Sequence, residues 1–168
     1  RLALNRIPWL LIMAAVAILT GMIIRGFEDV LATSIVLTSC IPMLMNTGGN
    51  CGSQSSVSVI RALSLDEIGF SDLARVVWKE IRVSVICGAV LAAANFAKLM
   101  LLDKLVLGYP ITLPVAAVVC LTLAVTVLAS KVIGCSLPLL AKKLGFDPAV
   151  MASPFITTLV DALSLLIY

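Results

Sequence analysis

Asp161 is the residue whose type and position most clearly demand chemistry. It stands inside the last apolar stretch of the chain, and no other charged side chain occurs between residues 148 and 168. A lone ionised carboxylate at membrane depth costs roughly 3 kcal/mol or more on insertion scales. It therefore needs a fixed partner, a water-filled cavity or a cation. Because the chain offers few fixed partners, a pore that binds a cation is the simplest explanation.

Two hydroxyl residues precede Asp161 at helical spacing. Ser153, Thr157 and Asp161 recur every four residues, which would align them in one polar stripe along an otherwise apolar helix. A single polar residue could bond to a neighbouring helix, but a stripe that ends in a carboxylate favours a pore lining. Pro154, in the same segment, has no amide hydrogen, so it leaves a backbone carbonyl free to bind water or an ion.

A second polar stretch, residues 46–56, contains no large apolar side chain. Facing lipid, it would expose polar groups at a cost of kilocalories, so it must face protein or water. Helix packing alone is one explanation, because small residues four apart let two backbones approach closely. Packing does not explain three amide side chains in the same stretch, and these favour an oxygen-rich pathway. The residues concerned are the glycines Gly48, Gly49 and Gly52 and the amides Asn46, Asn50 and Gln54.

The composition argues against several kinds of metal chemistry and against an enzyme. The chain has no histidine, and none of its five cysteines forms a Cys-x-x-Cys pair, so zinc, haem and iron–sulfur centres are poorly supported. Hard oxygen donors remain, and these suit Mg²⁺ or Ca²⁺. No Ser or Cys has a base nearby, and there is one deep carboxylate. We therefore predict a protein that is not an enzyme.

The elements that must position these residues are membrane-spanning helices. Of the 168 residues, 61% are hydrophobic and 12% are charged, against about 25% charged in soluble domains. A spanning helix needs about 20 mostly apolar residues. The sequence thus predicts an all-α membrane protein with five spans: Ile7–Ile24, Val30–Leu63, Val83–Leu102, Ile111–Leu140 and Pro148–Ile167.

The second and fourth spans are longer than a bilayer requires, and both contain helix breakers. Pro42 and the glycines of residues 46–56 interrupt the second, while Gly134 and Pro138 interrupt the fourth. Spans of this kind are tilted, kinked or locally unwound around a cavity.

Loop charge predicts a cytoplasmic N-terminus and a C-terminus outside. This orientation places eight basic residues inside and three outside, as the positive-inside rule expects. Lys131 lies within the fourth span, and we expect its amine to extend to water on the cytoplasmic side. The inner residues are Arg1, Arg6, Arg61, Arg75, Lys79, Arg82, Lys142 and Lys143, and the outer ones are Arg25, Lys98 and Lys104.

The one sizeable loop, residues 64–82, mixes acidic and basic side chains. Asp72, Arg75 and Lys79 fall at helical spacing, which predicts a short surface helix leading into the third span. The loop is either an ordinary connector or a contact for a soluble domain.

The two polar segments together resemble the MgtE-type magnesium channels. The run Gly48–Ser55, followed by Ile60 and Arg61, is similar to that family's second-helix signature. Its fifth helix is matched by Asp147, Pro148 and Ala149, then Pro154, Thr158 and Asp161, and the closing residues 165–168. The similarity covers essentially the whole chain, and five spans with this orientation agree with it.

The resemblance implies a homodimer in a cell inner (plasma) membrane, with one Mg²⁺ pore on the two-fold axis between the second and fifth helices. Asp161 corresponds to the family's selectivity carboxylate. Neighbouring pore-lining positions carry over to Ser153, Thr157 and the segment Gly48, Gly49 and Asn50. The chain would be the transmembrane domain, residues 1–168, without the cytoplasmic N-terminal domain and CBS-domain pair that family members carry before it.

One alternative from a different transport class stays open. A proton- or sodium-coupled secondary transporter would use Asp161 as its coupling carboxylate and the glycine-rich stretch as its substrate site. Flux that persists without proton or sodium gradients would separate the channel from this carrier.

Overall fold

The computed structural model describes residues 2–29, 35–148 and 153–168, and every regular element in these ranges is a helix. The side chains of residues 2–6, 8, 9, 35, 153 and 154 lie outside this description. The helices are α1 (Leu2–Gly26), α3 (Ile35–Ser64), the single turn η1 (Phe70–Asp72), α4 (Leu73–Lys98), the π-helical η2 (Leu99–Val106), α5 (Leu113–Lys143) and α6 (Ser153–Ile167).

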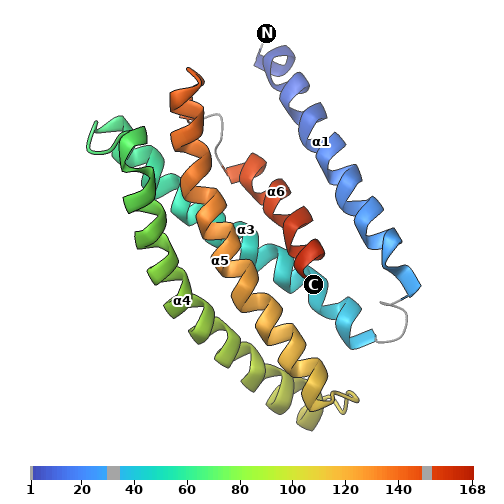
Figure 1. The fold of residues 1–168 in the computed structure, drawn as a ribbon. Helices are drawn as coiled ribbons and strands as arrows, with labels where there is room; N and C mark the ends of the chain where they lie inside the picture. The colour runs from blue at the N-terminus through green and yellow to red at the C-terminus, as the bar shows by residue number, and fades with distance from the viewer. Residues whose placement is uncertain (1, 30–34, 149–152) are drawn as a thin grey trace.

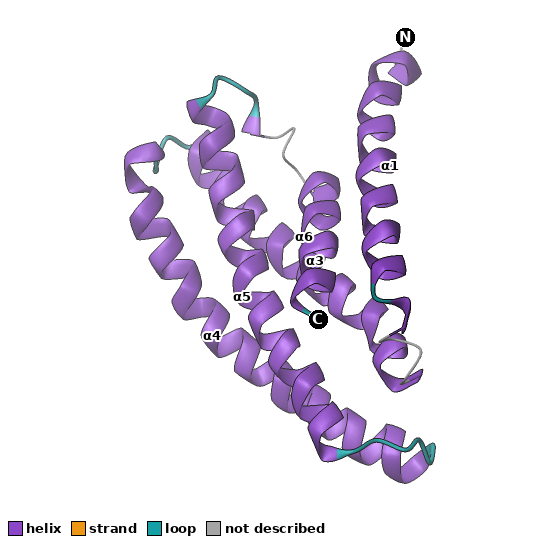
Figure 2. Cartoon of the chain, turned by 45° about the vertical axis from the view of Figure 1, so that its right-hand side comes forward, coloured by secondary structure: helices purple, strands orange, loops and turns teal. Residues whose placement is uncertain are grey.

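Helices α3 and α5 pack against each other at the centre of the bundle (Figure 1). Helix α4 lies along α5, and α6 packs on α3 with a smaller contact to α5. Helix α1 is the outermost element and touches the rest mainly through α6, as the turned view also shows (Figure 2). Two helices predicted to carry the polar residues, α3 and α6, are therefore direct neighbours.

The core follows the interface between α3 and α5 in three apolar clusters. Cys40 and Val119 belong to one, Leu44 and Val127 to the next, and Leu139 to the third. Leu99 of η2 belongs to the first cluster, the middle of α4 packs against the second, and the N-terminal part of α4 packs against the third. Burial of these side chains supplies the non-directional part of the helix packing.

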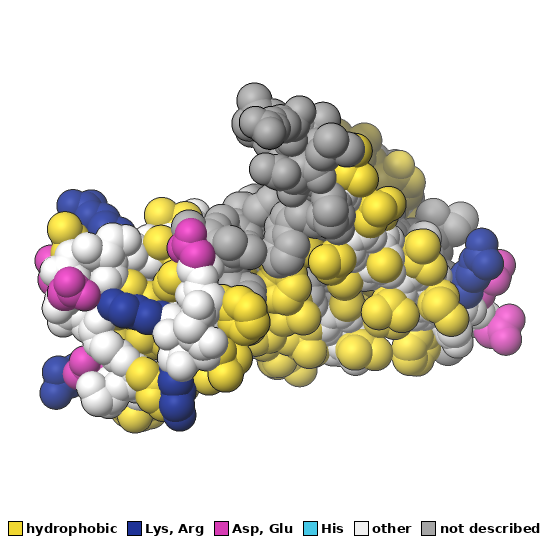
Figure 3. Space-filling model, turned by 90° about the horizontal axis from the view of Figure 1, so that it is seen from above, with side chains coloured by type: hydrophobic (Ala, Val, Ile, Leu, Met, Phe, Trp, Pro, Cys, Tyr) yellow, Lys and Arg dark blue, Asp and Glu magenta, His cyan; other side chains and the backbone are white. Residues whose placement is uncertain are grey.

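Many large apolar side chains are exposed on the outer surface. Ile18 on α1, Ile86 on α4 and Leu121 on α5 are 65%, 67% and 68% exposed. On the face seen in Figure 3, charged side chains gather at two ends of the molecule with an apolar belt between them. An exposed apolar belt of this extent is typical of a surface that meets lipid.

Two helical stretches among the described residues are long and apolar enough to cross a membrane, Phe70–Val106 and Leu113–Lys143. Leu10–Gly26 and Phe155–Ile167 are apolar but shorter. Helix α3 is in neither group, since its polar residues 46–56 lower its mean hydropathy. The all-helical prediction is confirmed for the described residues, whereas the count of five spans stays a prediction.

The structure changes the expected course of the chain before the third span. Residues 73–82 are not a separate surface helix, because α4 runs without a break from Leu73 to Lys98. Asp72 and Arg75 form an ion pair of 3.2 Å at its N-terminus. The apolar window used for span prediction missed this first part of α4 because its charged residues interrupt the apolar run.

The glycines in α3 and α5 do not unwind their helices. Both helices stay continuous through residues 46–56 and through Gly134, so the local unwinding foreseen among the alternatives is not found there. The two backbones meet at Gly52 and Gly134, where a Cβ added to Gly134 would lie 2.9 Å from the Gly52 Cα. Close helix contact offsets the roughly 1 kcal/mol that a glycine costs within a helix.

Candidate functional site

A cavity of about 460 Å³ lies where α3, α6 and the end of α1 meet. Its walls combine apolar side chains with the polar groups that the sequence singled out. Asn46, Gly49 and Asn50 line it from α3, and Thr157 and Asp161 line it from α6. The remaining lining residues are Ile24, Ile41, Pro42 and Met45.

The α3 wall of the cavity is one helical face. Pro42, Met45, Asn46, Gly49 and Asn50 follow one another at intervals of three, one, three and one residues, which is the spacing of a single helix face. Asn50 Nδ2 donates to Asn46 Oδ1 at 3.3 Å, so the two amides already form a linked pair. The second lone pair of Asn46 Oδ1 and the side-chain oxygen of Asn50 can still accept hydrogen bonds from the cavity.

Gly49 lets α6 approach this wall. A Cβ added there would lie 3.0 Å from the Thr157 Cγ2 and 3.4 Å from the Thr157 Cβ. The absence of a side chain at Gly49 therefore seats Thr157 against the backbone of α3, one helical turn before Asp161.

Asp161 supplies the charge of the cavity. Its side chain is half-buried, and none of the ion pairs found among residues 2–29, 35–148 and 153–168 involves it. The described part of the chain also contains no group of three or more His, Cys, Asp or Glu side chains that could hold a metal ion. One chain thus brings one carboxylate, two side-chain amides and a hydroxyl to this cavity.

The other predicted residues have different positions. Gly48 is buried away from the cavity, and a Cβ there would lie 2.8 Å from Thr126 Cγ2 and 2.9 Å from Val160 Cγ1. Gly52 faces α5 and Ile156 in the same way. Gln54 is exposed one turn beyond Asn50 and accepts a bond from Ser58 at its backbone carbonyl. The side chains of Ser153 and Pro154 lie outside the described residues.

Four cavity residues were not predicted to line it. Ile24, Ile41 and Met45 are ordinary for a membrane helix, so their types carry no signal, and Pro42 was singled out only as a helix breaker. The helical periodicity of the α3 face around Gly49 would have found Pro42 and Met45, because they fall on the same face as Asn46 and Asn50.

The predicted environment of Lys131 was also wrong. Its amine was expected to reach water, but its side chain is 7% exposed and lies 3.6 Å from Glu80 Oε2. The reading failed because Glu80 was placed in a loop, whereas it lies within α4 and meets Lys131 between helices.

The helical fold, the exposed apolar belt and the cavity lined with polar groups are together typical of a membrane protein. The chain belongs to the MgtE family of divalent cation transporters, whose family model matches residues 41–168. This family consists of transporters and not of enzymes, in agreement with the prediction from the sequence.

Three curated relatives named magnesium transporter MgtE match nearly the whole chain. The protein of Thermus thermophilus is 37% identical over 166 residues, which cover 98% of this chain and 35% of the relative. The Bacillus subtilis protein is 35% identical and the Enterococcus faecalis protein 31% identical, each over 167 residues, 99% of this chain and 35% of the relative. The chain therefore spans about a third of the length of these relatives.

Proposed function

We propose that this chain is the pore-forming transmembrane domain of a Mg²⁺ channel. Two copies would place their α3 and α6 helices around a two-fold axis, with the paired Asp161 carboxylates on the ion path. The observation that carries the proposal is the cavity in which Asp161 and Thr157 of α6 meet Asn46, Gly49 and Asn50 of α3. The relatives' names, which specify magnesium, support the choice of ion.

The size and chemistry of the cavity suit a hydrated ion. Mg²⁺ dehydrates reluctantly and is held through one or two carboxylates with several waters retained. Six waters occupy about 180 Å³ at the volume of liquid water, so a cavity of about 460 Å³ admits a hydrated ion. Amide and hydroxyl oxygens of Asn46, Asn50 and Thr157 would accept hydrogen bonds from those waters, while Asp161 supplies the attraction.

The membrane arrangement is part of the same proposal. Five spans, a cytoplasmic N-terminus and an external C-terminus in the plasma membrane would put Asp161 towards the outer half of α6. Passive entry would then follow the membrane potential, which is worth about 2.3 kcal/mol per charge per 100 mV. The other predicted residues would lie next to the ion path or in the helix packing that supports it: Ser153, Gly48, Gly52, Gln54 and Pro154. In the complete protein, cytoplasmic N-terminal and CBS domains would regulate the domain.

The proposal predicts that Asp161→Ala and Asp161→Asn both reduce Mg²⁺-selective flux at least tenfold, while the dimer still assembles. Removing two charges from the path removes the attraction that draws a divalent ion out of water, and Asn keeps only the shape. The measurement is Mg²⁺ flux into liposomes with proton and sodium gradients collapsed. The matched control is Asp66→Asn. That carboxylate is 91% exposed and lies in the segment after α3, far from Asp161 in the sequence.

Undiminished Mg²⁺-selective flux in either Asp161 variant contradicts the pore assignment. Flux of the unchanged protein that stops when proton or sodium gradients are collapsed supports a coupled transporter instead.

A further inference from the structure

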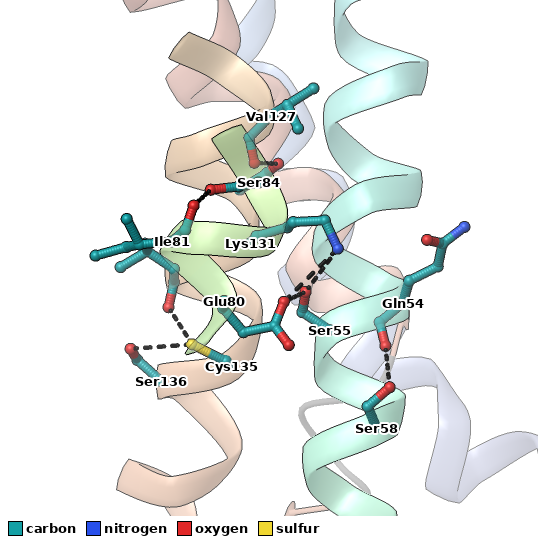
Figure 4. Close-up of polar contacts among 12 residues, drawn as sticks. Gln54, Ser55, Ser58, Glu80, Ile81, Ser84, Val127, Lys131, Cys135 and Ser136 are labelled. Atoms are coloured by element: carbon teal, nitrogen blue, oxygen red, sulfur yellow. Dashed lines mark hydrogen bonds and ion pairs between the residues drawn. The ribbon is translucent and has the colours of Figure 1, made fainter. Parts of the chain in front are cut away.

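A buried polar cluster joins three helices on the side of α3 that faces away from the cavity. Ser55 Oγ donates to Glu80 Oε2 at 2.8 Å, and Lys131 Nζ donates to Ser55 Oγ at 3.4 Å. Figure 4 shows the three side chains converging from α3, α4 and α5. The side chains of Glu80 and Lys131 are 13% and 7% exposed, so the pair is largely removed from water.

Stability alone does not account for this cluster. Replacing a buried ion pair by apolar residues of similar volume is often neutral or stabilising, because burying two charges carries a large desolvation penalty. A bonded polar group in an apolar setting does supply direction, which apolar packing lacks. The cluster therefore fixes how α3 is placed against α4 and α5.

The neighbouring contact between α3 and α5 is made by backbone atoms and not by interlocking side chains. Gly52 and Gly134 bring the backbones of α3 and α5 together without any side chain of their own that could interlock. Ser55 lies one turn further along α3 on the same side, and Lys131 lies one turn before Gly134 on α5. The polar cluster thus provides directional bonds next to the part of this interface where the two glycines contribute no side chain.

The placement of α3 determines the geometry of the cavity. Helix α3 forms one wall of the cavity, opposite Thr157 and Asp161 of α6, and no residue of α4 or α5 lines it. Side chains extend about 5 Å from a helix axis, so a rotation of α3 by about 20° would move Asn50 by about 2 Å. Binding constellations need their groups held to about 0.5 Å. A small rotation would therefore displace Asn46 and Asn50 relative to Asp161.

We propose that Glu80, Lys131 and Ser55 are positioning residues that set the rotation and height of α3, and with them the affinity of the cavity for its cation. The proposal rests on the proposed Mg²⁺ pathway, because affinity for Mg²⁺ is the property that the cluster would tune.

The test is a doubly neutral variant, Glu80→Gln/Lys131→Met, measured in the reconstituted protein. Mg²⁺ flux is recorded against Mg²⁺ concentration, and Ca²⁺ flux is recorded beside it. We expect the half-saturating Mg²⁺ concentration to rise at least threefold or the Mg²⁺ over Ca²⁺ preference to fall at least threefold, with the unfolding temperature unchanged. Ser55→Ala, which keeps both charges, should change the same quantities in the same direction.

The matched control neutralises a more exposed pair that also joins α5 to the chain next to α3. Lys142 Nζ lies 3.3 Å from Asp66 Oδ1, with side chains 42% and 91% exposed. Asp66→Asn/Lys142→Gln should stay within twofold of the unchanged protein in affinity and preference. The reciprocal exchange Glu80→Lys/Lys131→Glu should recover at least half of the lost affinity, because it restores a charge pair between the same helices.

Hydrogen exchange separates a failure of this inference from a failure of the proposed function. Amide exchange within residues 42–56 should accelerate in the doubly neutral variant and in Ser55→Ala but not in the control, whether or not the protein carries Mg²⁺. A protein without Mg²⁺ flux refutes the proposed function by itself. Unchanged affinity, preference and exchange in the doubly neutral variant and in Ser55→Ala refute the positioning role.

Discussion

Gly134→Ala tests the closest helix contact of the bundle. The added Cβ would lie 2.8 Å from the carbonyl carbon and 2.9 Å from the Cα of Gly52, and closer still to the Gly52 carbonyl oxygen. Real Cβ atoms do not make contacts this short, and backbone atoms cannot rotate away as a flexible side chain does. Helices α3 and α5 must therefore separate.

The magnitude follows from two opposing effects. Overpacking a core costs typically 1–3 kcal/mol, and a clash with backbone belongs at the upper end, about 3 kcal/mol. Alanine recovers about 1 kcal/mol over glycine in helix propensity. The net loss is about 2 kcal/mol, which lowers the unfolding temperature by about 4–8 °C for a chain of this size.

The assay is thermal unfolding of the purified protein in detergent, with Gly21→Ala as the matched control. Gly21 lies inside α1 with no described atom within 4 Å of an added Cβ, so the control should be neutral or stabilised by up to about 1 kcal/mol. An unfolding temperature for Gly134→Ala at or above that of the unchanged protein would refute the close contact between α3 and α5.

Two further predictions concern α6. Gly49→Ala places a Cβ 3.0 Å from Thr157 Cγ2, so we expect it to shift Thr157 and reduce Mg²⁺ flux several-fold with little change in unfolding temperature. A large fall in unfolding temperature together with the loss of flux would indicate general misfolding instead. Tyr168→Phe removes the 2.9 Å bond to the Leu37 carbonyl oxygen, worth about 1 kcal/mol, and should lower the unfolding temperature by about 2–4 °C; an unchanged temperature would mean that this bond does not hold α6 to α3.

The helices could be predicted because apolar stretches of sufficient length need internal hydrogen bonds wherever they meet lipid. Prediction was weakest where charge and apolar character alternate. Helix α4 begins at Leu73, ten residues before the predicted start at Val83, since an apolar window cannot register a helix whose first turns carry Arg75 and Lys79. Misplacing Glu80 in a loop then led directly to the wrong environment for Lys131.

Several residues that line the cavity could be selected from side-chain type and spacing alone. Asn46, Asn50, Thr157 and Asp161 were predicted from their chemistry, and they line one cavity although α3 and α6 are about a hundred residues apart in sequence. The sequence could not tell Gly48 from Gly49. Adjacent helical residues point about 100° apart, so only the neighbours decide which of the two meets the cavity and which meets Thr126 and Val160.

The single carboxylate explains why the proposed pore needs two chains. One chain offers Asp161 and neutral oxygen donors, and a divalent ion at that site would keep a net positive charge. A second copy related by a two-fold axis brings a second carboxylate without any further residue, which balances the two charges of Mg²⁺. Neutral donors alone would bind the ion's waters too weakly to draw it from bulk solvent, and conduction also requires that the bound ion can leave. On this reasoning the proposed dimer and its proposed preference for a divalent ion would both follow from Asp161.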